Sequence, residues 1–226
     1  MHPIQFKELI SPESPSLIVV TGGPGAGKTS LINAAKQRFC EHVTIVPEAA
    51  TIVFSGGFWR GSTNVCRESA QRAIYHVQRQ MEQMAMFSSK GVVSVCDRGT
   101  LDGLAYWPHE RKTFFESFGT VEEKELGRYL AVIHLSVPDE AHGYNNYTNP
   151  IRNETASEAQ DLDEKITDAW KNHPRRIEIR SRNSFEDKIQ EALHALEELT
   201  PKCCAADPIV SFSKTLQMPP MGASIS

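Results

Sequence analysis

Five short segments of the chain are dominated by apolar and β-branched residues, as is typical of strands buried in a parallel sheet. They lie at residues 17–21, 43–46, 92–96, 130–135 and 176–179. Longer segments between them carry apolar residues at spacings of three and four, which indicates helices. This alternation predicts a three-layer α/β fold, in which helices cover both faces of a five-stranded parallel sheet.

The longest helical pattern ends at Gly91, and we expect its apolar stripe to pack into the core. The stripe consists of Ala70, Ile74, Val77, Met81, Met84 and Phe87. A mixed helical stretch is expected over 109–127, with three phenylalanines on its apolar face. A capping-box pattern at 155–158 and the pattern Ser184-x-x-Asp187 predict the starts of two further helices. The second of these carries Ile189, Ala192, Leu193 and Leu196 on one face. The glycine-rich residues 55–61 predict a loop.

The first predicted strand runs into Gly-Gly-Pro-Gly-Ala-Gly-Lys-Thr, which fits the G-x-x-x-x-G-K-[ST] pattern of a P-loop. Glycines let successive N–H groups turn toward one anion, and the following helix points its positive end at the phosphates. Lys28 would place its charge between the β- and γ-phosphates, and the Thr29 hydroxyl would complete a Mg²⁺ shell. The predicted nucleotide-binding residues here are Gly22, Gly23, Pro24, Gly25, Ala26, Gly27, Lys28, Thr29 and Ser30.

Charged residues follow the next two predicted strands. Glu48 comes after the second strand, and the pair Asp97-Arg98 comes after the third. Because the C-terminal ends of parallel strands meet at one edge of the sheet, we expect these side chains to share a cleft with the P-loop. Asp97 is placed to hold Mg²⁺ opposite Thr29, and Arg98 to bind phosphate or stabilise a moving phosphoryl group. Glu48 is a candidate general base for an acceptor hydroxyl; alternatively, it orients a metal ligand.

A long polar loop is expected over 139–155, leading into a capped helix. It carries Arg152, and an arginine on such a segment is typical of a lid over a triphosphate, here spanning about 139–160. Asn183, just past the fifth predicted strand, is a candidate contact to the nucleotide base by its position.

Composition limits the classes of partner. The 226 residues carry a formal net charge of −4, which gives no electrostatic footprint for nucleic acid or an anionic membrane. The sequence contains no apolar run of membrane-spanning length, so we expect a cytoplasmic protein without membrane insertion. The five cysteines lack metal-ligand spacing and are expected to be reduced thiols. We expect a lead-in over 1–15, one domain over 16–200 and a flexible tail over 201–226.

Two sequence features argue against familiar hydrolases. The chain has no Asn-Lys-x-Asp guanine-reading sequence, which makes a Ras-like GTPase a poor fit. Asp97 is followed by an arginine and not by the carboxylate with which ring-type or motor ATPases polarise an attacking water. A base after the second strand, a metal-binding aspartate beside an arginine, and an arginine lid favour transfer to a bound hydroxyl over hydrolysis.

The ordered motifs over roughly residues 15–200 resemble one P-loop NTPase family closely. They are Val46-Pro47-Glu48-Ala49-Ala50, Asp97-Arg98-Gly99-Thr100-Leu101-Asp102, Asn149-Pro150-Ile151-Arg152, Leu162-Asp163, Ala169-Trp170 and His173-Pro174. This family joins the ribosylnicotinamide kinase domain to the fly photoreceptor-channel translocation-defect ATPase. The resemblance implies a nucleoside-kinase-like AAA domain that binds Mg²⁺ and nucleotide, with a small-molecule acceptor. A looser similarity runs to deoxynucleoside kinases, from whose Asp/Glu-Arg-Ser motif this chain departs at Gly99.

We therefore expect a phosphotransferase that uses Mg²⁺ and ATP, with GTP also possible, on a hydroxyl of a nucleoside- or riboside-like molecule. Lys28, Arg98 and Arg152 would neutralise the developing phosphoryl charge, and Glu48 would position the acceptor. The acceptor pocket is expected between Glu48, residues 55–61 and the Trp107 region. The alternative is a nucleotide-controlled binding module or slow NTPase that binds a protein or, as one branch of the family is described, a lipid headgroup.

Overall fold

The computed structural model describes residues 15–87, 92–137, 156–180 and 184–202. Five parallel strands form one sheet in the order β2-β3-β1-β4-β5, which confirms the predicted α/β fold class. The strands are β1 (Ser16–Thr21), β2 (Val43–Val46), β3 (Val93–Asp97), β4 (Tyr129–Leu135) and β5 (Arg176–Ile179). Each begins and ends within one residue of its predicted segment. Burial of the central strands leaves uninterrupted apolar runs in the sequence, and these mark the strands clearly.

The strand register brings three strand ends to one place. Val20 of β1 pairs with Asp97 of β3, and Val46 of β2 pairs with Cys96 of β3. Because β3 is the direct neighbour of both β1 and β2, the residues that follow these strands share one edge of the sheet. Cys96 itself is fully buried in the core, as expected for a small apolar residue.

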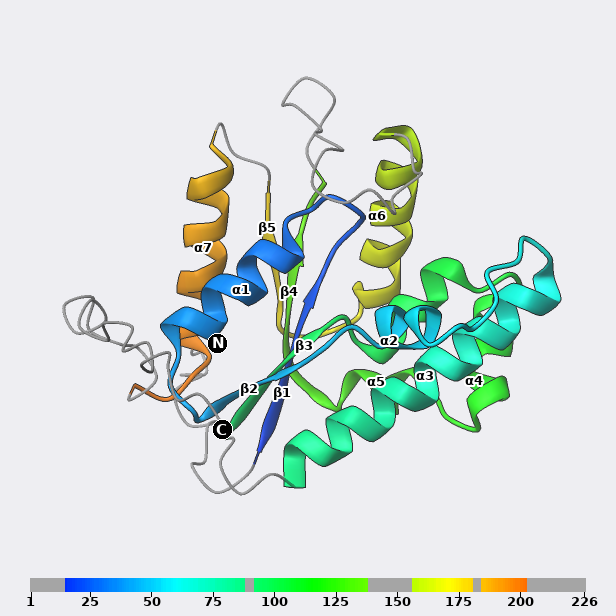
Figure 1. The fold of residues 1–226 in the computed structure, drawn as a ribbon, viewed down its shortest axis with the longest axis horizontal. Helices are drawn as coiled ribbons and strands as arrows, with labels where there is room; N and C mark the ends of the chain where they lie inside the picture. The colour runs from blue at the N-terminus through cyan, green and yellow to red at the C-terminus, as the bar shows by residue number, and fades with distance from the viewer. Residues whose placement is uncertain (1–14, 88–91, 138–155, 181–183, 203–226) are drawn as a thin grey trace, which may run out of the picture.

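Helices form a layer on each side of the sheet, as Figure 1 shows. On one side, α1 (Lys28–Arg38) packs against α7 (Phe185–Glu198). The other side carries α2 (Ala49–Ser55), α3 (Asn64–Phe87), α4 (Arg111–Phe118), α5 (Glu122–Leu126) and α6 (Ala156–Trp170). A 3₁₀ helix, η2 (Thr100–Tyr106), follows strand β3 in the chain and packs against α6.

The predicted packing of α3 is wrong at the C-terminal end of its stripe. Met84 and Phe87 are 73% and 81% exposed. The residues that α3 buries are Ala70, Gln71, Tyr75, Gln78, Glu82 and Ala85. This face contains polar side chains because they find partners inside the protein: Gln78 and Glu82 bond to each other at 2.8 Å, and Glu82 also accepts from the Tyr129 hydroxyl. A polar residue with such partners can be buried at little cost.

Short elements were also missed by the sequence patterns. Residue Ser55, expected in a loop, ends the seven-residue helix α2, which is too short to show a clear period. The helical stretch expected over 109–127 is two helices, because Gly119 adopts a left-handed φ of 59° and ends α4. The 3₁₀ helix η2 was not predicted either.

Several expectations concern residues outside the described ranges. The predicted helix end at Gly91 and residues 203–226 of the predicted tail belong to this group, and the domain limits of 16–200 stay a prediction. Over the described ranges, no helix is both long and apolar enough to cross a membrane.

Candidate functional site

The P-loop, residues 22–29, connects the end of β1 to the first turn of α1. Gly22, Gly25 and Gly27 have φ angles of 135°, 80° and 103°, a region that L side chains rarely adopt. A Cβ atom on Gly22 would lie 2.1 Å from the carbonyl oxygen of Leu135. The backbone therefore has the conformation that the glycine spacing predicts, with the N-terminus of α1 at its end, as an anion cradle requires.

The Lys28 side chain is buried against the P-loop backbone. Its Nζ donates to the carbonyl oxygens of Gly22 and Gly23 at 2.7 and 2.8 Å. Burial, followed by the charge of Arg98, lowers the pKa of Lys28 to about 7, although nearby carboxylates act in the opposite direction. A phosphate bound here would raise this pKa, because an anion stabilises the charged ammonium.

Glu48 stands at the start of α2, two residues after β2, as its position in the sequence predicts. Its Oε1 accepts from Arg98 Nε at 2.7 Å, and its Oε2 accepts from the Thr51 hydroxyl at 2.5 Å. Burial raises the pKa of Glu48, but the Arg98 charge and the Thr51 hydrogen bond outweigh burial, so the net pKa lies below the usual value. Glu48 is therefore a carboxylate at neutral pH and can only accept hydrogen bonds.

Arg98 is held between two carboxylates. Besides its bond to Glu48, its Nη1 donates to Asp102 Oδ1 at 2.9 Å. Burial lowers its pKa, but Tyr106, Asp102 and Glu48 raise it further, and the net pKa lies well above the usual value. From its position after β3, Arg98 is predicted to bind phosphate, whereas in the structure its Nε and Nη1 atoms bind Glu48 and Asp102.

The backbone of Arg98 has a φ of 74°, the only positive value at a non-glycine residue in the described part of the chain. A left-handed conformation costs roughly 1–2 kcal/mol at such a residue, so the surroundings must hold it in place. The amide of Gln78 on α3 donates to the Arg98 carbonyl at 3.1 Å, and the Arg98 N–H donates to Val20 at 3.0 Å. Helix α3 and strand β1 thus fix the turn that presents Arg98.

Asp102, for which the sequence predicts no role at the site, organises the site from η2. It is buried and accepts four hydrogen bonds, from Thr21 Oγ1, Arg98 Nη1, the Gly99 N–H and Trp170 Nε1. Its spacing of four from Arg98 was an available signal. The indole of Trp170 also explains Gly99, because a Cβ there would lie 2.8 Å from the ring, so the serine of the deoxynucleoside kinase motif does not fit.

The oxygen donors near the P-loop fit Mg²⁺. Thr29 offers a hydroxyl at the exposed start of α1, and Asp97 offers a carboxylate at the end of β3. Burial and the negative neighbours Glu48 and Asp102 raise the pKa of Asp97 against the opposing charges of Lys28 and Arg98, so a cation beside it would be favourable. Among the described residues, no group of three His, Cys, Asp or Glu side chains could hold a metal. Proteins that bind Mg²⁺ beside a nucleotide commonly use one or two side chains, with phosphate oxygens and water as the other ligands.

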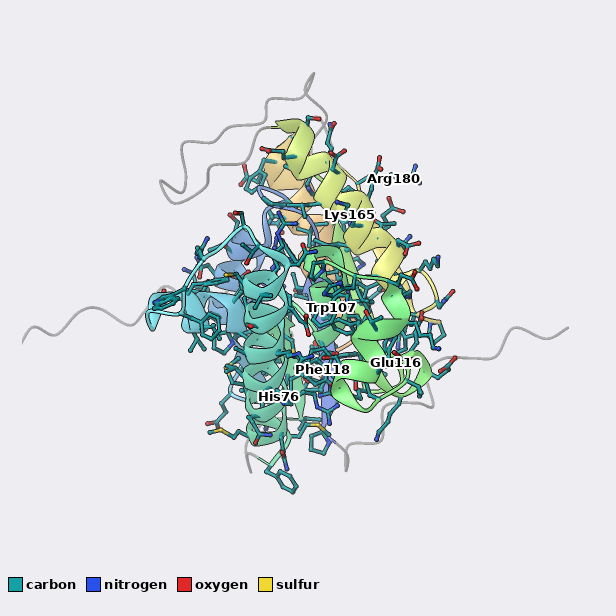
Figure 2. The ribbon with its side chains drawn as sticks, turned by 90° about the vertical axis from the view of Figure 1, so that its right-hand side faces the viewer. His76, Trp107, Glu116, Phe118, Lys165 and Arg180 are labelled. Carbon is teal, nitrogen blue, oxygen red and sulfur yellow. The ribbon has the colours of Figure 1, made fainter. Side chains whose placement is uncertain are left out.

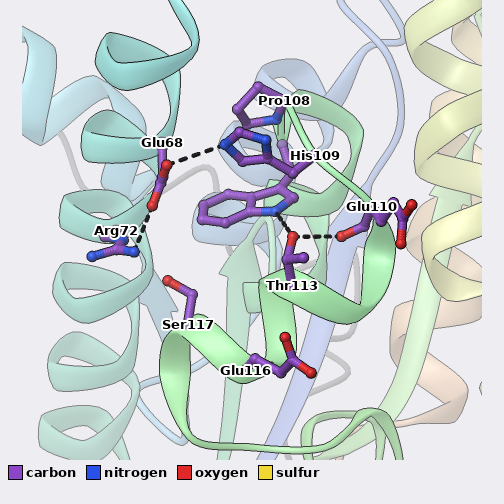
Figure 3. Close-up of a pocket in the computed structure, with 9 residues that line it drawn as sticks. Glu68, Arg72, Pro108, His109, Glu110, Thr113, Glu116 and Ser117 are labelled. Carbon is purple, nitrogen blue, oxygen red and sulfur yellow. Dashed lines mark hydrogen bonds and ion pairs between the residues drawn. The ribbon is translucent and has the colours of Figure 1, made fainter.

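A hollow of about 790 Å³ lies beside Trp107, between α3 and α4 (Figure 3). Its lining residues are Glu68, Arg72, Trp107, Pro108, His109, Glu110, Thr113, Glu116 and Ser117. The Trp107 N–H donates to the Thr113 hydroxyl at 2.9 Å, and Glu68 pairs with both Arg72 and His109. Figure 2 looks onto this side of the molecule. Glu48 and residues 55–61 do not line this hollow, so it differs from the acceptor pocket expected from the sequence.

Two predicted site residues, Arg152 and Asn183, lie outside the described residues, as does the 139–155 segment of the predicted lid. Pro24 and Ala26 lie in the P-loop, and Ser30 lies in the first turn of α1. The structure thus brings together Lys28, Glu48, Asp97 and Arg98, which influence one another's ionisation.

The parallel sheet and the glycine loop at its edge define a P-loop nucleotide-binding protein. The AAA_28 family model, described as an AAA domain, matches residues 17–188, and the chain belongs to this family. No curated protein matches the chain significantly.

Proposed function

We propose that this protein is a Mg²⁺-dependent phosphotransferase that transfers the γ-phosphoryl group of ATP, or GTP, to a hydroxyl of a nucleoside- or riboside-like molecule. The observation that carries the proposal is the oriented carboxylate of Glu48, held by Arg98 in the same charge cluster as Lys28 and Asp97. A carboxylate at this place suits an acceptor hydroxyl, which donates one hydrogen bond.

In the proposed step, the acceptor oxygen bonds to the γ-phosphorus while the bond from phosphorus to the β–γ bridging oxygen breaks. The nucleoside diphosphate leaves, and the hydroxyl proton passes to Glu48. Lys28 neutralises charge on the β- and γ-oxygens, and Arg152 is proposed to add charge from outside the described residues. Thr29 and Asp97 would hold Mg²⁺, which neutralises phosphate charge when bound.

The lowered pKa of Glu48 is compatible with this role. A phosphoryl group passes through a loose transition state, so the acceptor needs positioning more than a strong base. Arg98 keeps Glu48 ionised and fixes its orientation through the 2.7 Å bond to Oε1. We therefore assign Arg98 first to holding Glu48, and its contact with phosphate remains part of the proposal.

The test is a transfer assay with labelled ATP and GTP against nucleosides, nicotinamide riboside and inositol lipids. Wild-type protein should label one acceptor class. Glu48→Gln should reduce transfer roughly 10²- to 10⁴-fold while MgATP affinity stays near wild type. Glu41→Gln, an exposed glutamate before β2, is the matched control and should keep full activity. Transfer at the wild-type rate by Glu48→Gln would refute the assignment of Glu48.

A second candidate is a nucleotide-controlled binding module, and exposed aromatic residues favour it. Trp59 is 84% exposed, and Phe58 is also exposed, on the segment that follows α2 and its Glu48 cap. In that case wild-type protein should bind MgATP or MgGTP and label no acceptor, and nucleotide should change Trp59 emission. Labelling of any acceptor that depends on Glu48 decides for the phosphotransferase.

A further inference from the structure

Two charged side chains from the C-terminal part of the chain reach the P-loop from opposite helical layers. Asp163 on α6 accepts from the Gly23 N–H at 2.7 Å, and Lys188 on α7 donates to the Ala26 carbonyl at 2.9 Å. Lys188 is only 2% exposed. Both bind the backbone of the loop and neither has a role in the proposed transfer, so their position calls for a separate explanation.

Asp163 acts on the peptide between Gly22 and Gly23. The N–H of this peptide donates to Asp163, and its carbonyl oxygen accepts from Lys28 Nζ at 2.7 Å. A trans peptide points its N–H and C=O groups in opposite directions. By fixing the N–H on one side, Asp163 therefore fixes the carbonyl that holds Lys28 on the other side.

Lys188 acts on the peptide between Ala26 and Gly27 in the same way. Its ammonium takes the Ala26 carbonyl, so the Gly27 N–H must point away from Lys188. Gly27 is the N-cap residue of α1, and its N–H belongs to the donors that a P-loop offers to an anion. Lys188 thus sets the direction of an N–H group that a P-loop offers to phosphate, through the backbone of the loop.

The same two side chains also hold the end of β4. Asp163 Oδ2 accepts from the Val137 N–H at 3.0 Å, and Lys188 donates to the Ser136 carbonyl at 2.5 Å. Asp163 Oδ1 has a further contact at 3.0 Å with Nε2 of the buried His134. Each charged group is therefore anchored to β4 while it binds the loop, so it forms a fixed support.

Close packing leaves little freedom in these contacts. A Cβ on Gly23 would lie 2.6 Å from Val137 Cγ2 and 3.0 Å from Asp163 Cβ. A Cβ on Gly27 would lie 3.0 Å from the Phe185 ring of α7. These two glycines let α6 and α7 approach the loop closely enough for the two charged side chains to reach its backbone.

We propose that Asp163 and Lys188 are positioning residues for nucleotide binding, which together form a brace that orients the Gly22–Gly23 and Ala26–Gly27 peptides. This role requires that the P-loop binds nucleotide, as proposed above, but it does not require phosphoryl transfer. Neither residue belongs to the P-loop pattern. Asp163 lies 140 positions after Gly23, and Lys188 lies 162 positions after Ala26.

The first test measures MgATP and MgGTP affinity by calorimetry for Asp163→Asn and Lys188→Met, well below the melting temperature of each variant. An asparagine has one acceptor oxygen for the two N–H groups that Asp163 serves, and methionine leaves two carbonyls without a donor. We expect affinity to fall roughly tenfold or more in each variant. The controls Asp161→Asn and Lys36→Met change the same charges at exposed positions of α6 and α1 and should bind like wild type.

The second test reads the two peptides directly, through the backbone amide NMR signals of Gly23 and Gly27 without nucleotide. Asp163→Asn should shift the Gly23 signal, and Lys188→Met should shift the Gly27 signal. If Lys188→Met does not fold, Lys188→Gln, whose uncharged amide is one bond shorter than the lysine side chain, replaces it. Wild-type affinity in the folded variants, or unchanged signals of both glycines, overturns the proposal. A protein that binds nucleotide through this brace and labels no acceptor contradicts only the proposed transfer.

Discussion

Helices α7 and α3 cover opposite sides of the sheet, and they bury different kinds of side chain. The spacing of α7 predicts that Ile189, Ala192, Leu193 and Leu196 face inward, and the structure buries all four, together with Ala195. The face that α3 buries includes Gln71, Gln78 and Glu82, while Met84 and Phe87 remain exposed. Two clear helical periods therefore led to one correct packing face and to one that is wrong toward its C-terminal end.

The difference lies in what each helix packs against. The neighbours of α7 are mainly the apolar core and α1, with Lys188 as the buried charge. Helix α3 lies beside the turn of Arg98 and a buried ionic network, in which Glu82 pairs with Arg128 and Glu125 pairs with Arg128 and Arg79. Near such partners a polar face can be buried, so periodicity alone does not choose the inward face.

The largest expected effect tests the polar face of α3. Glu82→Ala leaves Arg128, which is mostly buried, with one of its two carboxylates, so the free energy of unfolding should fall by about 3 kcal/mol. Urea denaturation measures this, with the exposed neighbour Gln83→Ala as control, expected within about 0.5 kcal/mol of wild type. The pair Glu82→Leu with Arg128→Met should recover most of the loss. Equal free energies of unfolding for Glu82→Ala and Gln83→Ala would show that the polar face of α3 does not stabilise the protein.

The second prediction concerns pH and the buried charge of α7. Burial lowers the pKa of Lys188 from 10.5 to about 8, so between these values the unfolded chain binds a proton that the folded protein has lost. Stability must therefore rise with pH across this window, by about 3 kcal/mol from Lys188. Lys28, with a pKa of about 7, adds a rise that begins one pH unit lower.

Urea unfolding of wild type and Lys188→Met at about pH 8 and about pH 10 measures the Lys188 share. A rise of equal size in both proteins would contradict the assignment. Glu82 on α3 should give the opposite slope, because burial raises its pKa above 4.5, so the folded protein keeps a proton that the unfolded chain loses. Its contribution to stability falls as the pH rises above 4.5.

The smallest expected effect tests the exposed stripe of α3. Met84→Ser should change the free energy of unfolding by no more than about 0.5 kcal/mol, because the side chain is 73% exposed. Leu196→Ala at a buried position of α7 should cost about 3 kcal/mol. Thermal or urea unfolding compares the two. If Met84→Ser lowered the free energy of unfolding as much as Leu196→Ala does, Met84 would be buried, as the sequence predicts.

Much of the fold follows from local sequence. The central strands appear as apolar runs because both faces of each strand are buried, and Ser184 caps α7 through N–H groups two and three residues away. The face of α3 does not follow, since its partners Arg98 and Arg128 are distant in sequence. The short helix α2 has too few residues to show a period.

The sequence predicts those residues of the candidate site whose position depends only on the order of strands and helices. Glu48 lies two residues after β2, Asp97 ends β3 and Arg98 follows it, so parallel order brings them to the P-loop. Asp102 and Lys188 could not be assigned in this way. Their roles come from contacts with Trp170 and with Ala26, which no local pattern specifies.

The brace has a consequence for how the protein matures. Because synthesis runs from the N-terminus, the glycine motif leaves the ribosome before α6 and α7 do. A nascent chain that stops before residue 188 contains the complete motif but lacks one of its two supports. If the brace is required, competence to take up nucleotide arises only once α7 has been made and packed, as a property of the folded domain and not of the segment that carries the signature.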